Sequence, residues 1–163
     1  FFGVLDLIEK DFFKKESKIL LIHTGGLQGI EGINKQLERN NKVKINDLVT
    51  NQDGLIGKVV NISSNYSSIM LLSDPHSRVP VVPSSSREKG ILAKQGDNML
   101  LIYLTEEHNV KTGELLYTSG DGKVYPYGLL VGRVDKVTDD GVFVELSASL
   151  NKIEFVAITS TSK

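Results

Sequence analysis

Residues 114–137 read ELLYTSGDGKVYPYGLLVGRVDKV, and residues 47–62 read DLVTNQDGLIGKVVNI. Each stretch has an acidic residue, an apolar pair, a threonine, a glycine turn and then an apolar strand in which glycine precedes a basic residue and valine. Glycine weakens a strand but permits a bulge or a tight bend. The repeat therefore predicts two related β units, or one barrel built twice, with Gly57 and Gly132 at equivalent bent positions.

The sequence around this repeat predicts an all-β region from about residue 43 onward. Short apolar segments alternate with clusters of Gly, Asn, Asp and Ser at intervals of roughly 8–12 residues, which is typical of a barrel or a sandwich. The turn TDDG at residues 138–141 is a hairpin signal, because Gly141 can adopt a positive φ. We expect a mainly β protein.

Residues 1–42 show a different pattern. An apolar stripe from Phe1 to Phe13 has helical spacing, residues 19–22 form a short apolar run, and apolar positions recur at helical spacing between residues 30 and 37. This pattern predicts a helix–strand–helix segment of α/β type. The glycines in the turn HTGG, residues 23–26, leave backbone N–H groups uncovered, a geometry that can hold an anion. A plain strand-to-helix turn explains the same residues.

Composition excludes several classes of site. Hydrophobic residues make up 40% of the 163 residues and charged residues 24%, which is ordinary for a soluble globular protein. The net charge of −1 gives no indication of a nucleic-acid partner. The absence of cysteine excludes disulfides, zinc–thiolate sites and cysteine nucleophiles. No apolar run approaches the length of a membrane span. The chain begins at Phe1 and not at Met, so we expect a fragment or a processed product.

No catalytic or metal-binding constellation is recognisable. The histidines His23, His76 and His108 are far apart and lack a second histidine at metal-binding spacing, so we expect no metal site. Asp74 and the serines at 84–86 invite a Ser-His-Asp interpretation with His76, but no serine lies on a nucleophile turn. We expect no catalytic residues. Four aspartates lie at or beside glycines, where turn chemistry explains them better than acid–base catalysis: Asp53, Asp121, Asp139 and Asp140.

The β region, about residues 44–158, resembles the rod shape-determining protein MreC family. The most specific motifs are Thr118-Ser119-Gly120, then Tyr125-Pro126-Tyr127-Gly128, and Val131-Gly132-Arg133-Val134. The resemblance implies two small related β-barrels of the six-stranded type, similar in shape to chymotrypsin-type barrels but without a protease triad. We place them at residues 43–108 and 109–163, preceded by the α/β segment at 1–42.

This resemblance also implies a function. Members of the family act as a non-catalytic scaffold of the bacterial cell-wall elongation machinery and maintain rod cell shape. They self-associate at the periplasmic face of the inner membrane and organise peptidoglycan synthesis proteins, including penicillin-binding proteins and other members of the rod complex. The family usually carries an N-terminal membrane helix and a coiled coil, and we expect neither in this chain.

Residues 1–41, through LIEKDFFKKESKILLIHTGGLQGIEG, resemble the C-terminal end of pyridoxal-phosphate enzymes of the aminocyclopropane-carboxylate deaminase and D-cysteine desulfhydrase group. The resemblance implies that the turn at Thr24, Gly25 and Gly26, with His23, is the relic of a cofactor site. We expect no bound cofactor, because the cofactor domain and its lysine would lie upstream. The chain would then be a chimera joined near residues 41–46, by natural fusion, assembly artefact or a truncated reading frame. The alternative function is a fragment of such a deaminase or desulfhydrase.

Overall fold

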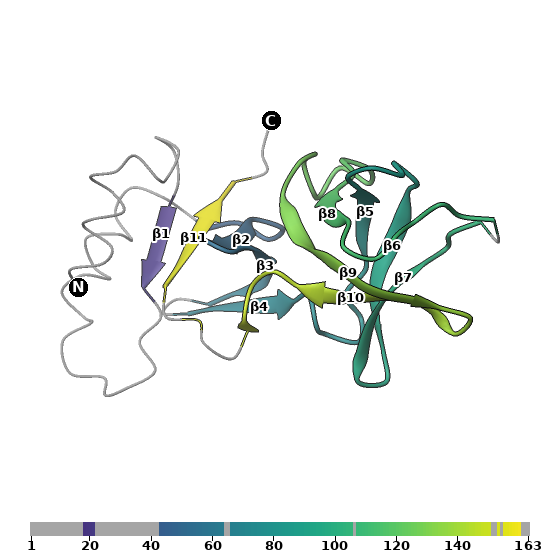
Figure 1. Ribbon diagram of the computed structural model, residues 1–163. Coiled ribbons are helices and arrows are strands. Elements are labelled where there is room, and N and C mark those ends of the chain that lie inside the picture. The colour runs from purple at the N-terminus through teal and green to yellow at the C-terminus, as the bar shows by residue number, and fades with distance from the viewer. Residues whose placement is uncertain are drawn as a thin grey trace.

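The fold consists of two neighbouring β-sheets (Figure 1). The computed structural model describes residues 18–21, 43–63, 66–105, 107–150, 153 and 155–160. Their strands are β1 (Lys18–Leu21), β2 (Leu48–Asn51), β3 (Gly54–Ile62), β4 (Ser67–Leu71), β5 (Val79–Pro83), β6 (Gly90–Gln95), β7 (Asn98–Ile102), β8 (Leu115–Thr118), β9 (Leu130–Thr138), β10 (Gly141–Leu146) and β11 (Phe155–Thr159). One sheet has the order β1-β11-β2-β3-β4, and the other is a closed barrel with the order β10-β7-β6-β5-β8-β9. The expected mainly β fold is confirmed.

Strand pairing divides the chain differently from the boundaries expected at residues 43–108 and 109–163. β5, β6 and β7 pair with β8, β9 and β10 to close the barrel, while β11 returns to pair with β2 in the first sheet. The boundary expected at residue 108 therefore falls inside the barrel, and the first sheet is built from both ends of the β region. Of the expected helix–strand–helix segment, the strand is present as β1, and both helices lie outside the described residues.

The two sheets repeat one arrangement of strands. The order β1-β11-β2-β3-β4 corresponds to β6-β5-β8-β9-β10, and β7 is the additional strand that closes the second sheet into a barrel. The register matches as well, with one residue bulged out of the pairing at the same place. The corresponding pairs are Val49–Gly57 and Thr50–Leu55 in the first sheet, and Leu116–Gly132 and Tyr117–Leu130 in the barrel.

Gly57 and Gly132 occupy equivalent positions at these bulges, as the sequence repeat predicts. A Cβ atom on Gly57 would collide with the carbonyl oxygen of Met70 on β4, and a Cβ on Gly132 would collide with that of Glu145 on β10. These two carbonyls occupy the same place in the two ladders. Glycine is therefore required at both positions by the close approach of the neighbouring strand.

The repeat extends upstream to a buried acidic residue that precedes the first strand of each repeat. Asp47 Oδ2 accepts a hydrogen bond from the backbone N–H of Lys44 at 2.7 Å, and Glu114 Oε1 accepts one from that of Lys111 at 2.9 Å. The residue before the acid has a positive φ in both turns, 70° in one and 91° in the other. The tetrapeptides KIND and KTGE thus fold as the same turn, although their middle residues differ.

A shared hydrophobic core joins the two sheets. Leu48, Leu55 and Leu72, from the first sheet and the segment after it, belong to the same buried cluster as the barrel interior. A Cβ on Gly54 of β3 would lie 2.6 Å from the carbonyl oxygen of Leu130 on β9, so the backbones of the two sheets meet here. The first sheet has a second, smaller core of its own, formed by Val49, Ile56, Val59, Ala148, Val156 and Ile158.

Glu114 ties the loop between β5 and β6 to the start of β8. Its Oε2 accepts hydrogen bonds from the backbone N–H groups of Ser85 and Ser86 at 3.1 and 2.9 Å, and from the Ser86 hydroxyl at 3.1 Å. Burial alone would raise the pKa of Glu114, but the hydrogen bonds from Ser86, Lys111 and Ser85 outweigh burial and lower the pKa below its ordinary value of 4.5. The loop therefore binds the ionised carboxylate.

We predict that Gly132→Ala destabilises the protein by about 1–3 kcal/mol, because the new methyl group must displace the β10 backbone at the bulge. The free energy of unfolding in urea measures the effect. Asp135→Ala on the exposed side of the same strand is the matched control, and we expect it to change the free energy by less than about 0.5 kcal/mol. Equal effects of the two variants would contradict the close approach of the strands.

Acid should weaken the hydrogen bonds that hold the β5–β6 loop to Glu114. Because its pKa is lower in the folded chain, the carboxylate stabilises the fold fully above its ordinary value of 4.5, and this contribution is lost as the pH falls through the folded pKa. We expect Glu114→Gln to cost about 1.5–3 kcal/mol at neutral pH and to flatten the pH dependence of stability below about pH 4.5. Urea midpoints measured across that range test this. The control is Glu145→Gln, at an exposed ion pair with Arg133, and an unchanged acid slope in Glu114→Gln would refute the assignment.

Candidate interaction surface

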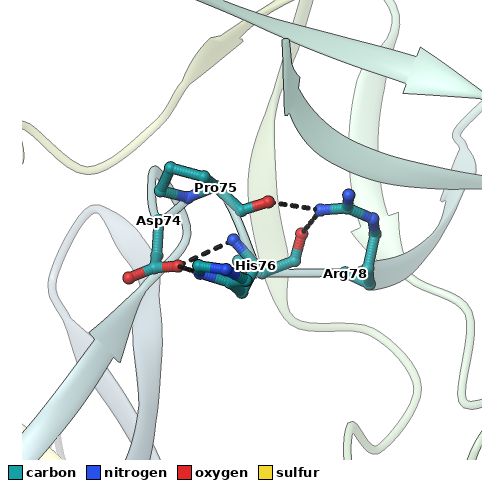
Figure 2. Close-up of polar contacts among 5 residues, drawn as sticks. Asp74, Pro75, His76 and Arg78 are labelled. Carbon is teal, nitrogen blue, oxygen red and sulfur yellow. Dashed lines mark hydrogen bonds and ion pairs between the residues drawn. The ribbon is translucent and has the colours of Figure 1, made fainter.

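Of the residues that suggested a Ser-His-Asp triad, Asp74 and His76 lie together in one turn, whereas the Ser86 hydroxyl bonds to a different carboxylate. Figure 2 shows His76 turned toward Asp74, with the His76 Nδ1 atom 3.2 Å from Asp74 Oδ1. The same carboxylate oxygen accepts the backbone N–H of His76 at 2.7 Å, which is the pattern of an Asx turn. That backbone hydrogen bond lowers the pKa of Asp74. The His76 side chain is 87% exposed, and the Ser86 hydroxyl donates to Glu114 instead.

This turn connects the two sheets. Arg78 closes it, because its Nη1 atom donates hydrogen bonds to the carbonyl oxygens of Pro75 and Ser77 at 2.8 and 2.7 Å (Figure 2). The chain then enters β5 and the barrel. The geometry gives Asp74 and His76 a role in the connector between the sheets.

The other candidates from the sequence lie in separate places. Asp53 is in the β2–β3 turn, where its backbone N–H donates to the Asn51 side chain at 2.9 Å, and residues 139–140 form the β9–β10 turn. Within the described ranges, no group of three or more His, Asp or Glu side chains is placed to hold a metal ion. The turn at Thr24, Gly25 and Gly26, and His23 beside it, lie outside the described residues.

Three loops meet at one end of the barrel. The β5–β6 and β8–β9 connections lie at the upper end in Figure 1, opposite the β6–β7 turn. Lys89 Nζ lies 3.0 Å from Asp121 Oδ2 and joins these two connections. The hydrogen bond from the Ser119 hydroxyl and then that from Lys89 lower the pKa of Asp121. The third loop follows β7 and is attached by the backbone N–H of Asn109, which donates to Glu88 at 2.6 Å.

Large exposed side chains project from these loops. Tyr127 is 60% exposed, and Tyr103, which follows β7 beside the start of β6, is 81% exposed. Arg87 Nη1 donates to the Tyr127 hydroxyl at 2.9 Å, and its guanidinium lies 5.7 Å from the centre of the Tyr127 ring. Arg87 and Tyr103 have positive φ values of 59° and 61°, which side chains of this size rarely adopt. We call Arg87, Lys89, Tyr103, Asp121 and Tyr127 the barrel-end surface.

Sequence reasoning did not identify this surface. Tyr127 stood out only as part of the Tyr-Pro-Tyr-Gly motif, and Tyr103 lies within the apolar run MLLIYL, which is typical of a buried strand. Their exposure depends on positive φ values and on contacts between loops that are distant in the sequence. Tyrosine and arginine are, with tryptophan, the side chains enriched at the energetic centres of protein interfaces, so this surface is our candidate site. In the part of the chain that is described, no helix has the length and apolarity needed to cross a membrane.

Known proteins share this fold and sequence. Residues 33–160 match the family described as "Rod shape-determining protein MreC, barrel core". The cell shape-determining protein MreC of Caulobacter vibrioides is 37% identical over 117 residues, which cover 71% of this chain and 34% of that protein. The chain spans about a third of the length of such relatives, 34% and 35% for two of them.

Solved structures agree on the fold. A structure named MreC aligns with a TM-score of 0.76 at 20% identity and covers 96% of this chain and 95% of its own. A complex between the penicillin-binding protein PBP2 and MreC from Helicobacter pylori aligns with a TM-score of 0.58 at 12% identity and covers 88% of this chain and 87% of that chain.

These comparisons give no support to the expected chimera. The family match begins at residue 33, before the junction expected near residues 41–46, and the alignment that covers 96% of the chain takes in most of residues 1–42. The resemblance of this segment to pyridoxal-phosphate enzymes therefore finds no support. The match over residues 33–160, together with the repeated β-sheets that it spans, shows that the chain belongs to the MreC family of rod shape-determining proteins.

Proposed function

We propose that this chain is part of a non-catalytic scaffold of the bacterial cell-wall elongation machinery, which maintains rod shape by binding and organising peptidoglycan synthesis proteins. The observation that carries this proposal is the family match over residues 33–160, because its curated relatives are cell shape-determining proteins. A location at the periplasmic face of the inner membrane belongs to the same proposal. It is supported by the fold shared with the major periplasmic domain of the cell shape-determining filament MreC.

The proposed partners are penicillin-binding proteins, other members of the rod complex and further copies of this chain. The structural neighbour from H. pylori, which was solved in complex with PBP2, supports the first partner. The neighbour described as a cell shape-determining filament supports self-association. No nucleic acid is among the proposed partners, because the chain has a net charge of −1.

The barrel-end surface is the partner-binding face in this proposal. Its loops are tied to one another by Lys89–Asp121 and by the hydrogen bond from Asn109, so binding orders few groups that were free before. Arg87 holds the Tyr127 ring in place while leaving more than half of the side chain exposed. A rigid aromatic side chain with a polar tip offers large contact area at low entropic cost.

The same contacts support a scaffold rather than a hydrolase. Nucleophilic catalysis by serine needs a base within hydrogen-bond reach of the hydroxyl. The Ser86 hydroxyl donates instead to the carboxylate of Glu114, and His76 bonds to Asp74 in an exposed turn.

We predict that the double variant Tyr103→Ser with Tyr127→Ser weakens binding to the PBP2-type transpeptidase of the same organism by at least about tenfold, because each truncation removes a buried aromatic anchor from the complex. Biolayer interferometry with the purified proteins gives the dissociation constant. Tyr66→Ser, at a tyrosine that is 65% exposed on the first sheet, is the matched control, and its affinity should equal that of the parent. An unchanged affinity of the double variant would show that the partner does not bind at the barrel-end surface.

A fluorophosphonate probe tests the absence of catalysis. We expect no stoichiometric labelling of any serine, because the Ser86 hydroxyl donates to Glu114 and His76 bonds to Asp74. Mass spectrometry of the treated protein reads out the modification. Labelling of a single serine that disappears in His76→Ala would contradict the proposal that the protein is non-catalytic.

A further inference from the structure

The hydrogen-bonding groups of Thr118 are all directed at the chain segment around Tyr127. Thr118 ends β8 and is fully buried. Its hydroxyl donates to the carbonyl oxygen of Pro126 at 2.5 Å and accepts the backbone N–H of Leu129 at 2.9 Å. Its backbone N–H donates to the carbonyl oxygen of Leu129 at 2.9 Å, and its carbonyl oxygen accepts the N–H of Gly128 at 3.0 Å. One residue therefore holds the chain on both sides of Tyr127.

The backbone of Tyr127 also rests against Gly120. A Cβ atom on Gly120 would lie 3.2 Å from the Tyr127 Cβ and 3.4 Å from the Tyr127 backbone nitrogen, and the φ of Gly120 is 81°. Two residues before Tyr127, the side chain of Tyr125 is buried in the core that the two sheets share. Tyr127 is thus an exposed side chain on a backbone that buried contacts fix.

Two of the four hydrogen bonds of Thr118 depend on its side-chain hydroxyl. Valine has nearly the same shape as threonine but no hydroxyl, so it would leave the Pro126 carbonyl and the Leu129 N–H without this partner. Serine keeps the hydroxyl and lacks only the methyl group. The Oγ1 atom of Thr118 can therefore be removed or retained by substitutions that change the volume of the side chain little.

We propose that Thr118 is a positioning residue of the partner-binding site, whose hydroxyl fixes the backbone of Tyr127 so that the ring is presented in its bound orientation. The inference rests on the proposed function, in which the barrel-end surface is the partner-binding face. A tyrosine that is fixed before binding loses little conformational freedom in the complex, so its contacts give more affinity than those of a mobile tyrosine. Thr118 acts on the partner only through Tyr127.

Amide hydrogen exchange on the free chain tests the positioning. We expect the Leu129 amide to exchange at least about tenfold faster in Thr118→Val than in the parent, because its hydrogen bond to the hydroxyl is lost, and Thr118→Ser to retain the protection. The control is the Val134 amide, which donates to the carbonyl oxygen of Glu114 and should exchange at the parent rate. Equal exchange of Leu129 in the parent and in Thr118→Val would overturn the inference.

A double-mutant cycle with the PBP2-type transpeptidase of the same organism tests the consequence for binding. We expect Thr118→Val to raise the dissociation constant about three- to tenfold, Thr118→Ser to restore most of the affinity, and Thr118→Val to have no further effect in a chain that carries Tyr127→Ser. An equal loss of affinity in both backgrounds would show that Thr118 does not act through Tyr127, and would overturn the inference.

Gly120→Ala is the second variant, for use if Thr118→Val does not fold. The added methyl group crowds the backbone of Tyr127 from the other side, so we expect a weaker affinity that again disappears in the Tyr127→Ser background. These measurements separate the inference from the proposed function. A parent chain that binds the transpeptidase with an affinity unaffected by Thr118→Val contradicts the inference alone, whereas a parent chain that does not bind contradicts the proposed function and the inference with it.

Discussion

The two sheets depend on one steric constraint, the contact between a strand backbone and the carbonyl of its neighbour at the bulge. At Gly57 and Gly132 that carbonyl occupies the space in which any amino acid except glycine would place its Cβ atom. Successive side chains of a strand point to opposite faces, so Leu55 of β3 lies in the core shared with the barrel while Ile56 lies in the separate core of the first sheet. β3 is therefore covered on both faces, which lets one strand belong to the first sheet and also pack against the barrel.

The parts of the fold that depend on local sequence could be predicted, whereas the contacts between residues far apart in the chain could not. The Gly-basic-Val repeat can be recognised in the sequence, because the close approach of a neighbouring strand requires glycine at the same position of both repeats. The pairing of β11 with β2 could not be predicted, because it joins the two ends of the β region and neither strand has a sequence feature that identifies its partner. The same reason hid the role of the serines at 84–86, whose acceptor Glu114 lies 28 residues beyond Ser86. Local composition correctly indicated a loop there but could not name its partner.

The barrel-end surface places large side chains in fixed positions. Its loops come from three separate connections, and each is attached to another by a polar contact. The positive φ of Arg87 and Tyr103 costs conformational energy that the surrounding barrel must supply. Rigid strands below and tied loops above hold exposed tyrosines in fixed positions, which no isolated loop of this composition would do.

The return of β11 to the first sheet has a mechanical consequence. β1 and β11 are antiparallel neighbours, with Lys18 opposite Ile158, so the chain enters and leaves the described fold at adjacent points of one sheet edge. A pulling force applied at these two points loads their hydrogen bonds one after another, as in a zipper, and not all at once in shear. The barrel is inserted between β4 and β11 and lies outside this line of force. Tension on the chain would therefore open the first sheet while the barrel, with its tyrosines, keeps its shape.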